Sequence, residues 1–63
     1  MVAFRAIYDD GIKKTIDLTK YVNPYTSEAE IWSMGAREAA LAHQNNKGFP
    51  IGLNCLILID KEV

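Results

Sequence analysis

Cysteine and histidine are scarce in this chain of 63 residues, which contains one of each, Cys55 and His43. A lone cysteine cannot form a disulfide within the chain. One cysteine and one histidine also cannot supply the four nitrogen and sulfur ligands of a structural zinc site. We therefore expect neither a metal site nor a cofactor, and a cysteine inside an apolar run is typical of a reducing cytoplasm.

An excess of charge of one sign is also lacking. Seven Lys and Arg residues stand against eight Asp and Glu residues, for a net charge of −1, and the cations are scattered along the chain. Proteins that bind a phosphate backbone present clustered cations, so this pattern disfavours nucleic acid as a partner.

Long apolar runs are absent as well. No stretch approaches the roughly 20 apolar residues of a membrane-spanning helix. The first residues lack the basic and then apolar pattern of a signal peptide. We therefore expect a soluble, cytoplasmic protein that does not contact a membrane.

The length predicts a single domain, residues 1–63. A chain of this size buries only about 60% of the surface that its unfolded form exposes, so it is marginally stable alone. Small domains compensate with disulfides, metals, oligomerisation or very good packing. Because disulfides and metals are excluded, oligomerisation and tight packing remain.

Residues 53–59, with the sequence LNCLILI, are apolar and rich in branched side chains, which is typical of a β-strand. Alternation places Leu56 and Leu58 on one face, and on the other face Leu53, Cys55, Ile57 and Ile59. A strand that is apolar on both faces needs cover on both. The rest of the chain supplies one helix, enough for one face, so this strand predicts a partner, most simply a second copy.

A β-hairpin is predicted at the start of the chain. Residues 2–8 and 12–18 both read as strands, and Asp9–Gly11 between them is a turn signal, because Asp and Gly tolerate a positive φ. The second strand carries a polar face, which is typical of an edge strand. The side chains that share one face of the first strand are Val2, Phe4, Ala6 and Tyr8.

One helix is predicted between the hairpin and the last strand. Ser27 followed by Glu30 matches a capping box, so we expect the helix to run from about residue 28 to residue 44 or 45. The Asn and Gly residues of 45–48 should end it in a left-handed conformation. At 100° per residue, the expected buried face consists of Ile31, Trp32, Gly35, Ala36, Ala39 and Ala42.

The element order β-β-α-β predicts an α+β fold, with a three-stranded antiparallel sheet of order 2-1-3 and the helix packed on one face. The alternative, with the third strand beside the second, would pair the most apolar strand with the most polar one. In the order 2-1-3 the third strand lies at an edge, and an apolar edge invites pairing with another chain. We expect Leu56 and Leu58 on an uncovered face beside Ile7. The predicted interface consists of Ile7, Leu56, Ile57, Leu58 and Ile59.

The residues that could carry catalysis have simpler structural explanations. His43 and Cys55 could be a base and a nucleophile, but a reactive cysteine needs exposure and a lowered pKa. Cys55 is better explained as a small buried hydrophobe, and Asp9 and Asp10 as turn residues. We therefore predict no catalytic residue.

The connector, residues 19–26, is unusually apolar for a loop because it contains Tyr21, Val22 and Tyr25. We expect it to lie across the core. If the two tyrosines are exposed instead, they form a candidate contact patch, and Arg5 on the first strand is a further candidate contact.

The favoured function is a non-enzymatic protein–protein interaction or accessory module that works as a homo-oligomer through its C-terminal strand. A symmetric dimer is the commonest assembly of this kind. The sequence leaves open whether the third strand pairs by its edge or packs by its face.

Two alternative functions remain. One is a nucleic-acid-associated accessory protein, in which oligomerisation gathers on one surface the cations Arg5, Lys13, Lys14 and Lys20. The other is a small enzyme with a site at a subunit junction, around Tyr25, Arg37 or His43.

Overall fold

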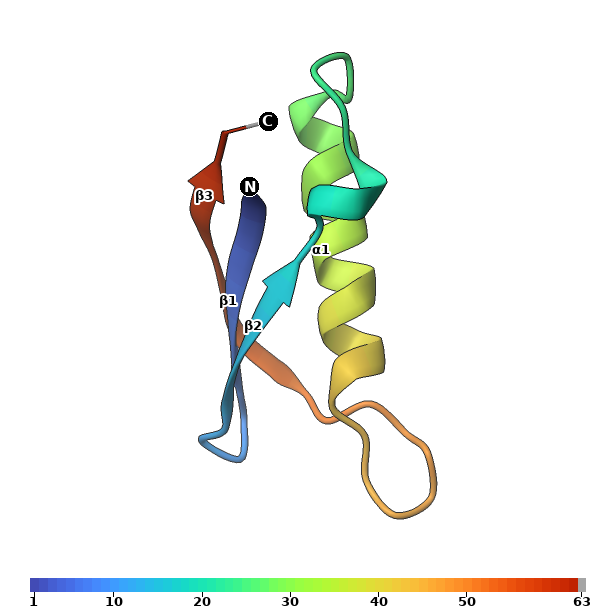
Figure 1. Cartoon of the computed structure of the whole chain (residues 1–63). Coiled ribbons are helices and arrows are strands. Elements are labelled where there is room, and N and C mark those ends of the chain that lie inside the picture. Colours follow the sequence, from blue (N-terminus) through green and yellow to red (C-terminus); the bar gives the residue numbers. More distant parts are fainter. Residues whose placement is uncertain (63) are drawn as a thin grey trace.

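The computed structural model describes residues 1–62 and shows a three-stranded antiparallel sheet with one helix packed against one face (Figure 1). The strand order is β2-β1-β3, so the predicted α+β architecture is confirmed. The elements in chain order are β1 (Val2–Tyr8), β2 (Lys13–Asp17), the short 3-10 helix η1 (Thr19–Tyr21), α1 (Glu28–Ala42) and β3 (Leu53–Lys61).

The hairpin between β1 and β2 closes through a three-residue loop, Asp9–Gly11. The Tyr8 N–H donates to the Ile12 carbonyl at 2.9 Å, and the Gly11 N–H donates to the Tyr8 carbonyl at 2.9 Å. Gly11 has a φ of 87°, whereas Asp10 keeps a negative φ. The turn therefore needs a left-handed conformation at the glycine alone, as three-residue hairpin loops do, and not at both residues of the Asp-Gly pair.

Helix α1 begins with the predicted capping box. The Glu30 N–H donates to Ser27 Oγ at 3.2 Å, and the Ser27 N–H donates to Glu30 Oε1 at 3.4 Å. Each side chain thus satisfies a backbone N–H that has no partner within the helix.

The helix ends earlier than predicted, at Ala42, because the following residues form a second loop. His43 is already extended, with a φ of −143°. The Asn45 N–H donates to the Phe49 carbonyl at 2.9 Å, and the Gly48 N–H donates to the Asn45 carbonyl at 3.0 Å. This is the bonding pattern of the β1–β2 loop, and Gly48, with a φ of 81°, completes that loop and does not cap the helix.

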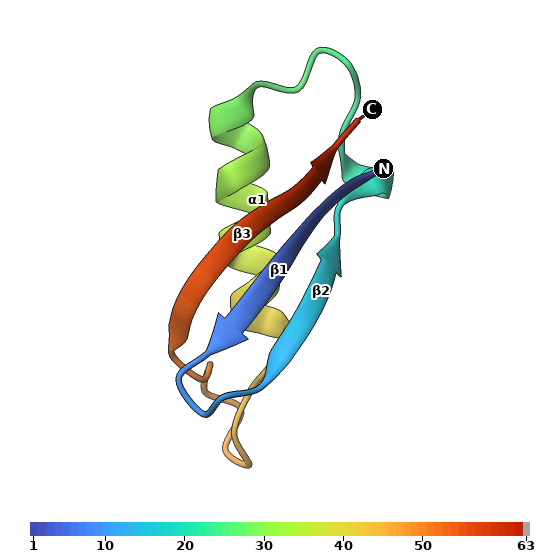
Figure 2. The same ribbon diagram turned by 90° about the vertical axis from the view of Figure 1, so that its left-hand side faces the viewer.

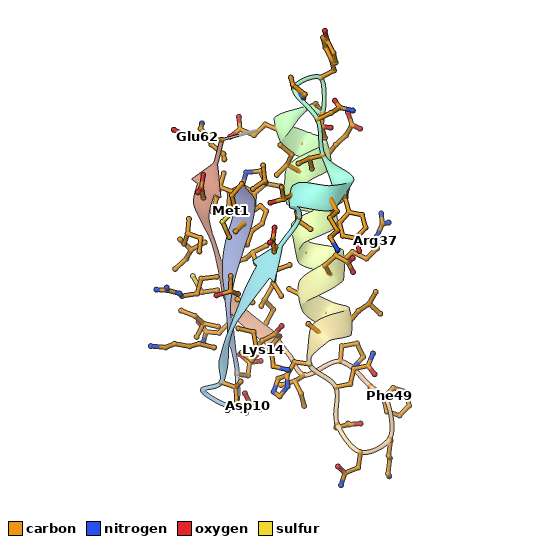
Figure 3. The ribbon with its side chains drawn as sticks, viewed as in Figure 1. Met1, Asp10, Lys14, Arg37, Phe49 and Glu62 are labelled. Carbon is orange, nitrogen blue, oxygen red and sulfur yellow. The ribbon has the colours of Figure 1, made fainter. Side chains whose placement is uncertain are left out.

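The hairpin supplies partners for carbonyl groups at the C-terminal end of α1. Tyr8 Oη donates to the Ala39 carbonyl at 2.6 Å, and Lys14 Nζ donates to the Ala42 carbonyl at 2.7 Å. Figure 3 shows Lys14 extending from β2 toward this end of the helix. Tertiary contacts therefore satisfy two of the last four carbonyl groups of the helix, and the helix end also gains a cation at the negative end of its dipole.

The core lies between α1 and one face of the sheet. All four residues predicted to share a face of β1 are buried there: Val2, Phe4, Ala6 and Tyr8. Ile31, Gly35 and Ala39 are the buried residues of α1. The predicted helical face is therefore correct along its centre, but Ala36, Ala42 and Trp32 at its margins are exposed.

Phe4 and Gly35 form the closest contact between sheet and helix. A Cβ atom on Gly35 would lie 2.6 Å from Phe4 Cε2, well inside van der Waals contact. The Phe4 ring also packs against Trp32 in a T-shaped arrangement, with centroids 4.8 Å apart. The missing side chain at Gly35 is thus what allows the helix to sit this close to β1.

Candidate interaction surface

Strand β3 has one free edge. It pairs with β1 along its length, and within residues 1–62 its other side faces no strand. Figure 2 views the sheet from the side away from α1 and shows β3 as an outer strand. The backbone N–H and C=O groups along that side are therefore available to another strand.

The pairing register decides which face of β3 the helix covers. Leu56 lies opposite Ala6, and Leu58 lies opposite Phe4, so both leucines share the face of β1 that packs on α1. Both are half-buried and contact the core. Our placement of Leu56 and Leu58 on an uncovered face beside Ile7 was therefore wrong, because directly opposed residues of antiparallel strands project to the same side.

The sheet face away from α1, which we call the open face, carries an apolar stripe. Ile57 lies opposite Arg5 and is 42% exposed; Ile59, two residues further along the same strand, is 44% exposed. Cys55 lies opposite Ile7, and both are half-buried. We call Ile7, Cys55, Ile57 and Ile59 the isoleucine stripe.

The rest of the open face is polar. Arg5 projects from its centre, and the exposed side chains of β2 on that side are Lys13, Thr15 and Asp17. Lys14 lies on the opposite side, bonded to the helix end. The cations of the nucleic-acid hypothesis are thus divided between the two faces of one subunit.

Two irregularities interrupt β3. The register shifts between Ile7 and Tyr8 and again between Ala3 and Phe4, so Asn54 and Ile59 are extra residues with no partner in β1. Such bulges bend a strand and disturb its ladder. They leave residues 55–58 as the regular part of β3.

The connector tyrosines are exposed, so our expectation that this segment lies across the core holds for Val22 alone. Val22 is half-buried against the core. Tyr21 is 61% exposed and Tyr25 is 93% exposed, in a turn where the Asn23 side chain accepts from the Tyr25 N–H at 2.8 Å. Arg5 lies on the open face, so it does not join Tyr21 in a single patch. A contact role for these three residues stays a prediction.

A groove along α1 was missed as a site by the sequence reasoning. Tyr21 lines a shallow hollow of about 360 Å³ together with Met34, Arg37, Glu38 and Leu41. Leu41 is 59% exposed, whereas Met34 packs against the core. The detectable signal was the pair of apolar residues, Met34 and Leu41, on the otherwise polar side of the helix.

His43 and Cys55 are not placed to act together. The His43 ring packs against the Tyr8 ring, with centroids 4.6 Å apart, on the helix side of the sheet. Cys55 lies opposite Ile7 on the open face. The base that we considered for Cys55 is therefore separated from it by the sheet.

His43 is bonded to the hairpin instead. Its Nε2 lies 2.7 Å from Asp10 Oδ2, and because a carboxylate can only accept, the ring N–H donates. This bond, and next the bond from the Ile12 N–H, lowers the pKa of Asp10. Burial, and then the charge of Asp10, raises the pKa of Tyr8. The bond between His43 and Asp10 ties the residue that follows α1 to the first turn; Figure 3 shows Asp10 in that turn.

This geometry predicts an acid dependence of stability. A carboxyl group whose pKa is lower in the folded state stabilises that state above its unfolded pKa, near about pH 4, and the effect is lost as the pH falls through the folded pKa. We therefore expect the urea midpoint of the wild type to fall below about pH 4 more steeply than that of Asp10→Asn. Denaturation followed by circular dichroism at several pH values measures both slopes.

Asp17 provides the control for this experiment. Its pKa is also lowered, chiefly by bonds from Thr19. The urea midpoint of Asp10→Asn should therefore still fall as the pH is lowered, but less steeply than that of the wild type. The double variant Asp10→Asn/Asp17→Asn should be flatter still. Equal slopes in the wild type and in Asp10→Asn would contradict a folded-state bond between Asp10 and His43.

Comparisons with protein-family models, curated proteins and solved structures find no match to this chain. Within residues 1–62, no group of three or more His, Cys, Asp and Glu residues is arranged to hold a metal ion. In the same part of the chain, no helix has the length and apolar character needed to cross a membrane.

Proposed function

We propose that this chain is a non-enzymatic protein–protein interaction module that associates with copies of itself through β3. One observation carries the proposal: Ile57 and Ile59, 42% and 44% exposed, lie on an edge strand and adjoin the apolar residues Ile7 and Cys55. Single exposed apolar residues need no partner, but a contiguous group along an unpaired edge is typical of a surface that another chain covers.

The size of the domain supports the same proposal. A 63-residue chain has a small core, and its stability alone is marginal. Any partner that binds the folded state and not the unfolded state stabilises the fold by mass action. Self-association therefore gives a function to the exposed stripe and adds stability that a lone subunit lacks.

A charge on the stripe should abolish self-association. We expect the wild type to sediment as a dimer or larger oligomer at micromolar concentration, and Ile57→Lys to sediment as a monomer. The substitution places two like charges close together and removes apolar contact, which should weaken association at least about 100-fold. Sedimentation velocity over a concentration series measures the change.

Phe49→Lys is the matched control. Phe49 is 63% exposed in the loop that follows α1, and Figure 3 shows it at the end of the molecule, away from the middle of the sheet. It receives the same new charge and should assemble as the wild type does. A wild type that is monomeric at every concentration would refute the proposal.

A further inference from the structure

The proposed self-association leaves two arrangements of β3, and Arg5 distinguishes them. Arg5 projects from the central strand onto the open face, and within residues 1–62 it has no ion-pair partner. If two open faces packed together, this guanidinium would be taken out of water, which costs several kcal/mol and is offset only if a carboxylate of the partner subunit pairs with it in good geometry. Pairing through the β3 edge leaves Arg5 in solvent, so the edge arrangement is favoured.

From this we infer that two copies pair along β3 in antiparallel orientation, around a two-fold axis that passes through Ile57. The inference rests on the proposed self-association and adds the register. The axis is perpendicular to the sheet, so both helices lie on one side of a continuous six-stranded sheet. Opposed residues of antiparallel strands project to the same face, whereas consecutive residues of one strand project to opposite faces. The axis must therefore pair one residue with its own copy, and it cannot pair a residue with the copy of its neighbour.

The regular part of β3 limits where the axis can lie. A second strand needs an undisturbed ladder, and bulges at Asn54 and Ile59 bracket residues 55–58. An axis at Leu56 or Ile57 therefore lies beside the centre of this segment, and we compare these two registers with the next one along, at Leu58.

The axis at Ile57 matches apolar with apolar residues across the whole segment. Ile57 then faces its own copy, Leu56 faces Leu58 of the partner subunit, and Cys55 faces Ile59 of the partner subunit. The polar residue Asn54 falls opposite Asp60 of the partner subunit, whose carboxylate can accept from the amide. The one mismatch is the outermost pair, in which Leu53 faces Lys61 of the partner subunit.

Either neighbouring register creates mismatches closer to the axis, only two residues from it. An axis at Leu56 places the amide of Asn54 opposite Leu58 of the partner subunit. An axis at Leu58 places Leu56 opposite Asp60 of the partner subunit, and Cys55 opposite Lys61 of the partner subunit. Polar groups against apolar side chains forgo the cross-strand contacts that stabilise a sheet, so the Ile57 register is preferred.

This register also explains the two faces of β3. On the helix side, the half-buried Leu56 and Leu58 would contact each other between subunits and join the two cores. On the open face, Cys55, Ile57 and Ile59 of both copies would form one continuous apolar strip. Both apolar faces of β3 would then be in contact with the partner subunit.

Disulfide cross-linking tests the register directly. A disulfide requires Cα atoms about 4.4–6.8 Å apart, and opposed residues of antiparallel strands lie about 4.5–5.5 Å apart. In Cys55→Ala/Ile57→Cys the new thiols face each other, so mild oxidation should give about tenfold more covalent dimer than in the wild type. In the wild type the two Cys55 residues are four steps apart, roughly 13 Å, and should not link.

A second pair of variants checks the same register at another position. Ile59→Cys with Cys55 retained should link, because these positions face each other across the axis. Cys55→Ala/Ile59→Cys should not link, because each new thiol then faces an alanine. Circular dichroism confirms folding, and Ile57 and Ile59 are exposed enough for the fold to tolerate the changes.

The outcomes separate the register from the self-association. Two results would overturn the Ile57 axis and leave the proposed function standing. One is linking of wild-type Cys55; the other is no linking in Cys55→Ala/Ile57→Cys or in Ile59→Cys while sedimentation shows a dimer. A monomer in sedimentation would overturn both. Linking of both designs, with none in the wild type or in Cys55→Ala/Ile59→Cys, would establish the axis.

Discussion

Phe4→Ala should lower the free energy of unfolding by about 3–5 kcal/mol. Phe4 is fully buried, and its ring packs against both Gly35 and Trp32 of α1. Removing it leaves a cavity that the close approach of helix and sheet cannot refill, because Gly35 has no side chain to move into it. A domain of 63 residues has about 3–9 kcal/mol of stability in all. The substitution should therefore remove a large share of the total stability.

Urea denaturation followed by circular dichroism measures this loss, at one fixed protein concentration because self-association would shift the midpoint. Phe49→Ala is the control: it removes the same ring from a position that is 63% exposed and should change stability by less than about 0.5 kcal/mol. A loss below about 1 kcal/mol for Phe4→Ala would mean that the packing around Phe4 is not as tight as described.

The sheet order could be predicted because each strand carries its own pattern. The alternation of β1 identifies Val2, Phe4, Ala6 and Tyr8 as one face, and all four are buried. The polar face of β2 marks it as an edge strand, and the apolar β3 then fits best beside β1. The hydrophobic pattern of each strand thus indicates which strands lie side by side in the sheet, as well as which face of each strand is buried.

The orientation of β3 could not be predicted, because its pattern is nearly symmetric. Alternation separates Leu56 and Leu58 from Ile57 and Ile59, but both sets are apolar, and either could face the helix. The decision rests on the cross-strand register, where Leu58 meets Phe4. The same register leaves Ile57 on the open face, opposite Arg5, and places the two leucines on the core side.

The end of α1 and the position of Gly48 depend on contacts that are distant in sequence. Tyr8 and Lys14 bond the Ala39 and Ala42 carbonyl groups from the hairpin, and they take the place of a left-handed cap residue at this helix end. Gly48 is then free to close the second loop. A local rule for helix ends assigns the glycine to the nearest helix and cannot detect a cap supplied from another element.

The contact between Gly35 and Phe4 is another feature that no pattern reveals, and it yields a prediction in which one substitution reverses its effect. Gly35→Leu in the wild type forces a branched side chain into the Phe4 ring, since even a Cβ atom would lie 2.6 Å from Cε2. Overpacking of this kind costs about 1–3 kcal/mol, and the contact is close enough to expect the upper end. The better helix propensity of leucine offsets about 0.8 kcal/mol.

In the Phe4→Ala background, the same Gly35→Leu substitution should stabilise the protein by about 1–2 kcal/mol, because the leucine fills the cavity that the ring has left. Ala36→Leu is the matched control, since Ala36 is exposed on the next position of α1 and should have the same small effect in both backgrounds. Helix propensity is equal in the two backgrounds, so a change of sign at position 35 alone reports the packing. If Gly35→Leu destabilises both backgrounds equally, its cost arises within the helix, and the close approach of α1 to β1 does not depend on the missing side chain.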